Sequence, residues 1–137
     1  MYKALTDTPL VLPFLEEGIK AGFPSPAQDY ERQGIDLNKA LIKNAPTTFL
    51  AKVDGDSLCD AFVFDGDIAI VDKSLEPRDG CMVVACIDGE FAMKTVKKGN
   101  GDIFLIPKNP EYPIIKVNPD EPFSIWGVVT YTIHKQY

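Results

Sequence analysis

Histidine and cysteine are scarce in this chain of 137 residues, which has one histidine and three cysteines. Cys59, Cys81 and Cys86 are odd in number and lack metal-ligand spacing, so the sequence indicates neither a disulfide framework nor a zinc site. We expect no metal or other cofactor. A Ser-His-Asp or Cys-His arrangement would have to use His134, but a histidine in a terminal strand is more often a surface or edge residue.

Positive charge is also in short supply, and the formal net charge is −6 at pH 7. Such a chain has no general attraction to a phosphate backbone, so we expect no direct sequence-specific DNA binding. Lys94, Lys97 and Lys98 form one short basic cluster, which is more often a solvated turn. We find neither a signal peptide nor an apolar run of membrane length, which favours a protein of the reducing cytoplasm without membrane contact.

The first 45 residues show no clear strand alternation and are broken by prolines at 9, 13, 24 and 26. One short helix is expected within "IDLNKALIKNAP", with Asp36 as N-cap and with Leu37, Ala40 and Leu41 at helical spacing. Pro46 is expected to end it. The rest of this region is predicted to be an extended arm.

From Thr47 onward, strand patterns alternate with turn residues. The apolar and β-branched runs are separated by Asp-Gly turns, a strong hairpin pattern. "CMVVACI" is apolar on both faces, as expected of a strand buried between layers. The sequence therefore predicts a mostly β fold, with a β-rich domain at 47–137 behind the arm and its one short helix. The runs are "TFLAKV", "DIAIVD", "CMVVACI", "EFAMKTV", "IFLIP", "IIKV" and "FSIWGVVTYTI".

Two positions suggest a serine nucleophile that uses a lysine as its base. "VDGDSLCD" places Ser57 in a tight turn, where the backbone N–H groups of Asp56 and Ser57 can converge on an oxyanion. "EFAMKTVKK" places Lys94 on the same strand face as Ala92 and Val96, where a charged lysine is costly unless it is paired or neutralised.

Structural roles also explain these residues. Ser57 is then a turn-capping hydroxyl, and Lys94 a surface lysine with its stem along apolar groups. Cys59 is a rival nucleophile, but without a histidine or cation near it in sequence it is better interpreted as a small core residue. Asp65 and Asp67 flank Gly66, an arrangement that is usually just a turn.

Several ordered motifs closely resemble the LexA/UmuD family of self-cleaving serine peptidases. They are "GDS", "DGDIAIVD", "DGEFAMKTVKK", "LIPKNPEYPII" and "FSIWGVV", which together cover the β-rich half. "GFPSPAQDY" and "IDLNKALI" further resemble the UmuD branch, and extend the match to within about twenty residues of the start. The resemblance implies a LexA/signal-peptidase-like β-rich fold.

The resemblance also implies residue roles. Ser57 would be the nucleophile, Lys94 its general base and Ala21-Gly22 the bond that is cut. Cleavage in this family is stimulated by the RecA–single-stranded DNA filament during the SOS response. The shortened homodimer then joins a UmuC-type Y-family polymerase in error-prone translesion synthesis. The chain would divide into a removed segment at 1–21, an arm at 22–46 and the peptidase domain at 47–137.

The arm has the properties of a tethered substrate. Ala21 and Gly22 are small, and glycine permits backbone geometry that a Cβ would block. Pro24 and Pro26 keep the following chain extended, and tethering raises the effective concentration of the bond at the enzyme. Whether cleavage is in cis or between the two copies of a dimer stays open.

Three other functions compete with this one. A repressor of the same peptidase family would need a helix-turn-helix before the cleavage site, and the 21 residues there contain Pro9 and Pro13. A signal-peptidase-like enzyme is disfavoured because we find no membrane anchor. The remaining alternative is a non-catalytic polymerase-binding subunit with a vestigial Ser-Lys pair.

Overall fold

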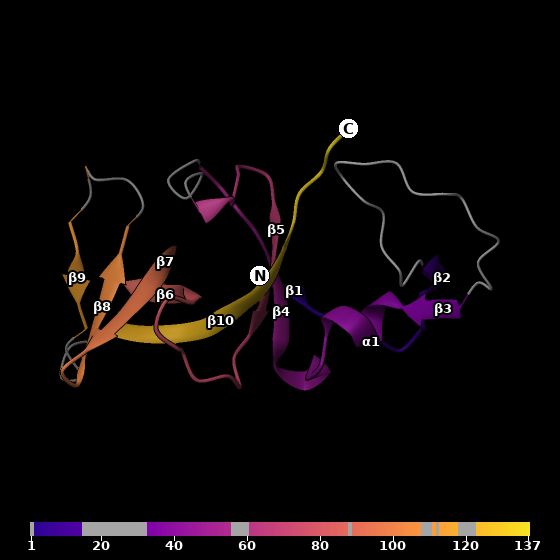
Figure 1. The fold of residues 1–137 in the computed structure, drawn as a ribbon, viewed down its shortest axis with the longest axis horizontal. Coiled ribbons are helices and arrows are strands. Elements are labelled where there is room, and N and C mark those ends of the chain that lie inside the picture. Colours follow the sequence, from indigo (N-terminus) through magenta and orange to yellow (C-terminus); the bar gives the residue numbers. More distant parts are fainter. Residues whose placement is uncertain are drawn as a thin grey trace, which may run out of the picture. The chain divides into compact units, whose positions relative to one another are not determined.

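The computed structural model describes residues 2–14, 33–55, 61–87, 89–107, 111, 113–117 and 123–137. They divide into two compact units, one formed by residues 1–4 and 44–137 and the other by residues 5–43 (Figure 1). Among the described residues, no helix is long and apolar enough to cross a membrane.

The smaller unit is a two-stranded antiparallel sheet followed by one helical turn. β2 (Val11–Phe14) pairs with β3 (Gln33–Asp36), with Phe14 opposite Gln33. Helix α1 (Leu37–Leu41) begins as predicted, since the Asp36 carboxylate accepts a hydrogen bond from the Asn38 amide. The helix ends at Leu41, five residues before the proline that was expected to end it, because Ile42 already has extended backbone angles.

Within the described residues, the larger unit is built on an eight-stranded antiparallel sheet, and the mostly β prediction is confirmed. Its strands lie in the order β1-β4-β5-β10-β6-β7-β8-β9 (Figure 1). A short 3-10 helix (Ala45–Thr47) leads into β4. The strands are β1 (Tyr2–Lys3), β4 (Thr48–Lys52), β5 (Ile68–Asp72), β6 (Met82–Ile87), β7 (Glu90–Gly99), β8 (Asp102–Ile106), β9 (Ile115–Lys116) and β10 (Phe123–Ile133).

Asp-Gly turn chemistry joins these strands as the sequence predicts. Gly66 and Gly80 have φ of +85° and +84°, a backbone conformation that side chains with a Cβ rarely adopt. Between β7 and β8, Asn100 and Gly101 both have positive φ, as the tight turn of a two-residue hairpin requires. The local sequence therefore sets where most strands of the larger unit begin and end.

The long strand β10 joins two halves of the sheet, because it pairs with β6 through Phe123–Val128 and with β5 through Val128–Ile133. Its register shifts between Ile125 and Gly127 and again between Val129 and Tyr131. Such irregularities increase the local twist of a strand. The sheet therefore turns through β10 (yellow in Figure 1).

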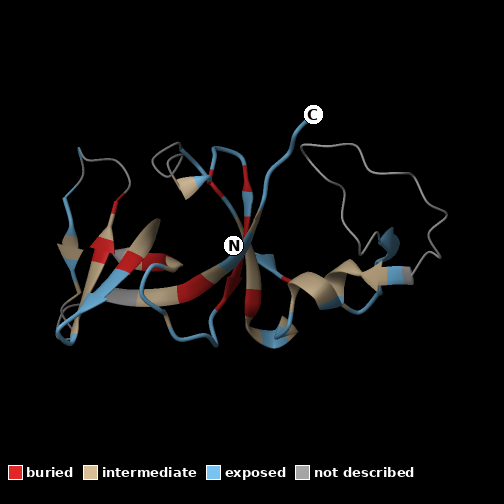
Figure 2. Ribbon diagram, in the orientation of Figure 1, coloured by how far each residue is buried: buried red, intermediate tan, exposed pale blue. Residues whose placement is uncertain are grey.

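Two clusters of buried side chains form the core, and they lie along the strands (red in Figure 2). "CMVVACI" is buried on both faces as predicted, since Val84 belongs to one cluster while Val83 and Ala85 belong to the other. The first cluster contains Val53, Val63, Ala69, Val71 and Val84. The second contains Val83, Ala85, Val96, Leu105 and Val128.

Candidate active site

A cavity of about 530 Å³ lies in the larger unit. Its walls come from β1, β4, β6 and β7, although β4 and β7 are separated in the sheet by β5, β10 and β6. The curvature of the sheet therefore brings two distant strands to one hollow. The lining residues are Tyr2, Leu50, Ala51, Lys52, Val53, Asp54, Gly55, Val84, Phe91, Ala92, Met93 and Lys94.

Lys94 lies in β7 and contributes to this cavity. It is half-buried and stands opposite Val83 of β6, and Val96 is the next residue on the same face of the strand. Val83 and Val96 are almost completely buried. The sequence-based placement of Lys94 on an apolar strand face thus agrees with the register of β6 and β7. By contrast, Lys97 is exposed and pairs with Phe104 of β8.

Aromatic rings support the β7 side of the cavity. Phe91 packs edge-on against Trp126 of β10, with ring centroids 5.7 Å apart. Trp126 in turn packs edge-on against Phe49 of β4 at 5.0 Å. Edge-to-face pairs at these separations are favourable, so the three rings connect β4, β10 and β7.

The chain that leads toward Ser57 forms the opposite wall. After β4, the buried Val53 is followed by Asp54 and Gly55, and all three line the cavity with Lys94. The predicted nucleophile Ser57, the predicted oxyanion donor Asp56 and Cys59 lie outside the described residues. The predicted cleavage-site residues Ala21 and Gly22 lie outside them as well.

A network of hydrogen bonds closes the β4–β5 connection between Val53 and Asp67. The Val53 amide donates to the Asp67 carbonyl (2.7 Å), and the Gly66 amide donates to the Val53 carbonyl (2.8 Å). The Gly55 amide donates to the Asp65 carboxylate (2.8 Å). These bonds hold the two ends of the connection that contains Ser57 side by side.

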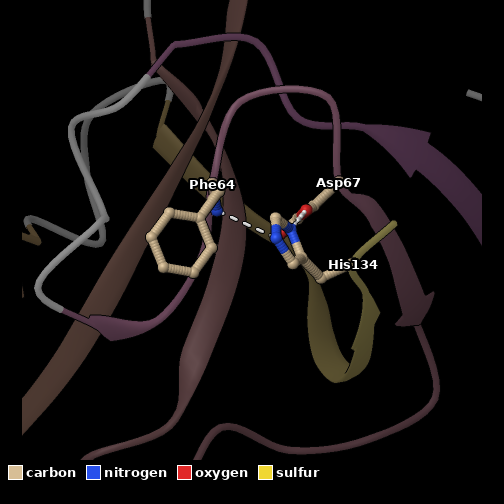
Figure 3. A network of polar contacts seen from close by, with 3 residues as sticks. All are labelled: Phe64, Asp67 and His134. Atoms are coloured by element: carbon tan, nitrogen blue, oxygen red, sulfur yellow. Dashed lines mark hydrogen bonds and ion pairs between the residues drawn. The ribbon is translucent and has the colours of Figure 1, made fainter. Parts of the chain in front are cut away.

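Asp67 is buried and uses both carboxylate oxygens. One accepts a hydrogen bond from the Phe64 amide (2.9 Å), and the other lies 2.5 Å from Nδ1 of His134 (Figure 3). The hydrogen bond from Phe64 lowers the pKa of Asp67, burial opposes this effect, and the hydrogen bond and charge of His134 add to the lowering. The Asp67 side chain is therefore an ionised acceptor at neutral pH.

A second buried acid, Asp72, stabilises the far end of β5. Its carboxylate accepts hydrogen bonds from Asn44 (3.0 Å), Thr47 (2.8 Å) and Ser74. Burial alone would raise the pKa of Asp72, but these hydrogen bonds outweigh it and the pKa is lowered. This network ties the 3-10 helix before β4 to the end of β5.

In the part of the chain that the structure describes, no group of three histidine, cysteine or acidic side chains is placed to hold a metal ion. Cys81 and Cys86 are free, half-buried thiols. Asp67 accepts a hydrogen bond within the turn, from Phe64, as the simpler interpretation of that motif predicts, but it also contacts His134, and Asp65 accepts from Gly55 outside the turn.

The sequence did not indicate two features of the site. His134 was expected to be a surface residue, and its side chain is indeed partly exposed, but it also contacts the buried Asp67. No role was predicted for Tyr2, but β1 pairs with β4 and Tyr2 lines the cavity. Both contacts join residues distant in sequence, and no local pattern marks them.

Comparison with known proteins gives consistent results over most of the chain. Residues 13–130 match the sequence profile of the family described as Peptidase S24-like. Protein MucA of Salmonella typhimurium is 40% identical over 123 residues, which cover 89% of this chain and 84% of MucA. Protein SamA of the same species is 42% identical over 123 residues, 90% of this chain and 85% of SamA. Protein ImpA, also from Salmonella typhimurium, is 36% identical over 135 residues, 94% of this chain and 88% of ImpA.

Proposed function

Because the chain belongs to the Peptidase S24-like family and is a UmuD-like protein of SOS mutagenesis, we propose that it is a serine peptidase that cuts its own Ala21-Gly22 bond. Members of this family are mostly self-cleaving serine peptidases. The observation that carries the proposal is the cavity that Lys94 shares with Gly55, two residues before Ser57. Two residues of extended chain span at most about 7 Å, so the Cα atom of Ser57 lies no farther than that from the Cα atom of Gly55.

In the proposed reaction, Ser57 Oγ attacks the carbonyl carbon of Ala21 while its proton passes to the neutral amine of Lys94. The Ala21–Gly22 C–N bond then breaks, the proton moves from Lys94 to the leaving amino group of Gly22, and Ala21 remains as an ester on Ser57. Water hydrolyses the ester and regenerates the serine. The backbone N–H groups of Asp56 and Ser57 are the proposed donors to the oxyanion.

The β2–β3 pair supports the role of the arm as substrate. β2 ends at Phe14 and β3 begins at Gln33, and these two residues stand opposite each other. Residues 15–32, which include the proposed cleavage site, connect these two strands in the sequence. A tethered substrate has a high effective concentration, so a weak peptidase can still cut it.

We further propose that the cleaved chain acts as a homodimer with a UmuC-like Y-family polymerase in the cytoplasm, and that a RecA–single-stranded DNA filament stimulates the cleavage. The similarity to MucA, SamA and ImpA supports this role. Association of two copies is further supported by β10, which within the described residues pairs only with β5 beyond Val128 and exposes Tyr131 and Ile133 there.

Four proteins test the proposal: the parent chain, Ser57→Ala, Lys94→Ala and the matched control Lys97→Ala. Each is incubated at alkaline pH and, separately, with RecA, single-stranded DNA and nucleotide, and the intact chain is quantified over time. We expect the parent and Lys97→Ala to be cut, and Ser57→Ala and Lys94→Ala to be slower by at least about a thousandfold. Cleavage of both dyad variants at the parent rate contradicts the dyad. A folded parent that is never cut favours the non-catalytic polymerase-binding subunit.

A further inference from the structure

His134 and Asp67 form a contact that the proposed chemistry does not use. His134 follows the last residue of β10, and its ring also packs against Phe64, with centroids 4.9 Å apart (Figure 3). The Asp67 side chain is 1% exposed, whereas that of His134 is 43% exposed. A partly exposed histidine near the end of the chain thus contacts a buried carboxylate.

The direction of this hydrogen bond follows from the state of Asp67. An ionised carboxylate only accepts hydrogen bonds, so Nδ1 of His134 must carry the proton and donate it. The other carboxylate oxygen is already engaged by the Phe64 amide. Phe64 and His134 therefore each engage one oxygen of the Asp67 carboxylate.

Asp67 connects this contact to the cavity. The backbone carbonyl of Asp67 accepts a hydrogen bond from the Val53 amide, and the amide of the neighbouring Gly66 donates a hydrogen bond to the Val53 carbonyl. Asp65 directly precedes Gly66, and its carboxylate accepts a hydrogen bond from the Gly55 amide. Every step from His134 to Gly55 is a hydrogen bond or a covalent link, and Val53 and Gly55 line the cavity with Lys94.

We infer that His134 is a positioning residue for self-cleavage: by donating to Asp67 it fixes the Phe64–Asp67 turn, which holds Val53 and Gly55 at the cavity that Lys94 lines, two residues before Ser57. This inference rests on the proposed function. The reacting groups of an enzyme must be held in well-defined positions, since a displacement of about 1 Å can lower the rate a hundredfold.

The chemistry of histidine supplies a sharp test. The side-chain amide nitrogen of asparagine occupies nearly the position of Nδ1, whereas that of glutamine reaches the position of Nε2. His134→Asn should therefore keep the donor to Asp67, and His134→Gln should lose it. Lys135→Ala, an exposed change in the same terminal segment, is the matched control.

The first measurement is the self-cleavage rate of the full-length chain at a temperature where every variant is folded. We expect His134→Gln and His134→Ala to be slower by about ten- to a hundredfold, and His134→Asn and Lys135→Ala to stay near the parent rate. Parent-like rates in His134→Gln and His134→Ala would overturn the inference. An equal loss in His134→Asn would overturn it too, because the donor at Nδ1 would then not be what matters.

The second measurement does not depend on cleavage. Amide hydrogen exchange at Phe64 and Gly55 is followed in full-length chains that also carry Ser57→Ala. Faster exchange in His134→Gln than in His134→Asn supports the hydrogen-bonded connection, and equal exchange contradicts it. If exchange responds as expected while the parent chain is never cut, the proposed function fails and the connection from His134 to Gly55 stands.

Discussion

Gly55 and Lys94 line the same cavity although they belong to opposite parts of the sheet, the first just after β4 and the second in β7. Three strands separate β4 from β7, so only the turn of the sheet through β10 brings them together. The proposed Ser-Lys pair therefore depends on the curvature of the whole sheet as well as on two local motifs.

Self-cleavage should accelerate as the pH rises from neutral into the alkaline range. A general base must be unprotonated to accept the proton of Ser57, so a rising pH favours catalysis by an amine base. Initial rates are measured by intact mass, and the fold is checked by circular dichroism at each pH. Lys94→Arg keeps a permanent charge and should not cleave at any pH. A flat or falling rate in the folded parent would argue against Lys94 as the base.

Gly127→Ala should destabilise the protein by about 1–3 kcal/mol, because the added methyl group overpacks the junction of β10 and β5. A Cβ at Gly127 would lie 2.6 Å from Cγ1 of Val71 and 3.3 Å from the carbonyl oxygen of Asp72. Denaturant unfolding measures the loss. The matched control is Gly99→Ala in β7, where a Cβ would meet no atom within 4 Å. Equal stability of the two variants would be inconsistent with close packing at Gly127.

Asp72 should make stability depend on pH in acid. Its pKa is lowered in the folded protein, so the unfolded chain binds the proton more tightly. The resulting stabilisation is fully present above the ordinary carboxyl pKa, near 4, and is lost as the pH falls through the lower folded value.

Thermal unfolding midpoints between pH 7 and acid should therefore fall less steeply for Asp72→Asn than for the parent. Thr47→Val removes one donor to Asp72 and should also reduce the slope, whereas Thr47→Ser keeps the hydroxyl and should preserve it. An unchanged slope in Asp72→Asn would show that the hydrogen bonds of Asn44, Thr47 and Ser74 do not favour the ionised form.

Local chemistry allowed much of the fold to be predicted. Asp36 caps its helix, the Asp-Gly turns delimit the strands, and the alternation in "EFAMKTV" puts Lys94 on the face of Val96. Each of these features is decided within a few residues of sequence. The strands β2 and β3 were not predicted, because Pro13 lacks an amide hydrogen and normally counts against a strand. Its place in a two-stranded sheet, where one side of each strand needs no partner, explains the exception.

The long-range contacts could not be predicted from the sequence. β1 is too short to show a pattern, and its pairing of Tyr2 with Leu50 depends on the exposed edge of β4. Likewise, nothing near His134 in sequence indicates Asp67 as its partner. The apolar face around Lys94 was predictable, but the cavity that it shares with Gly55 required the pairing order of the whole sheet.

The central claim is tested most directly by locating the new N-terminus after incubation with the RecA filament. The full-length chain and Ser57→Ala are compared by intact mass and N-terminal sequencing. We predict one new species that begins at Gly22, formed by the parent and absent from Ser57→Ala. A mass that never changes, or a product that begins elsewhere in the chain, would contradict the assignment of Ala21-Gly22 as the bond cut by Ser57.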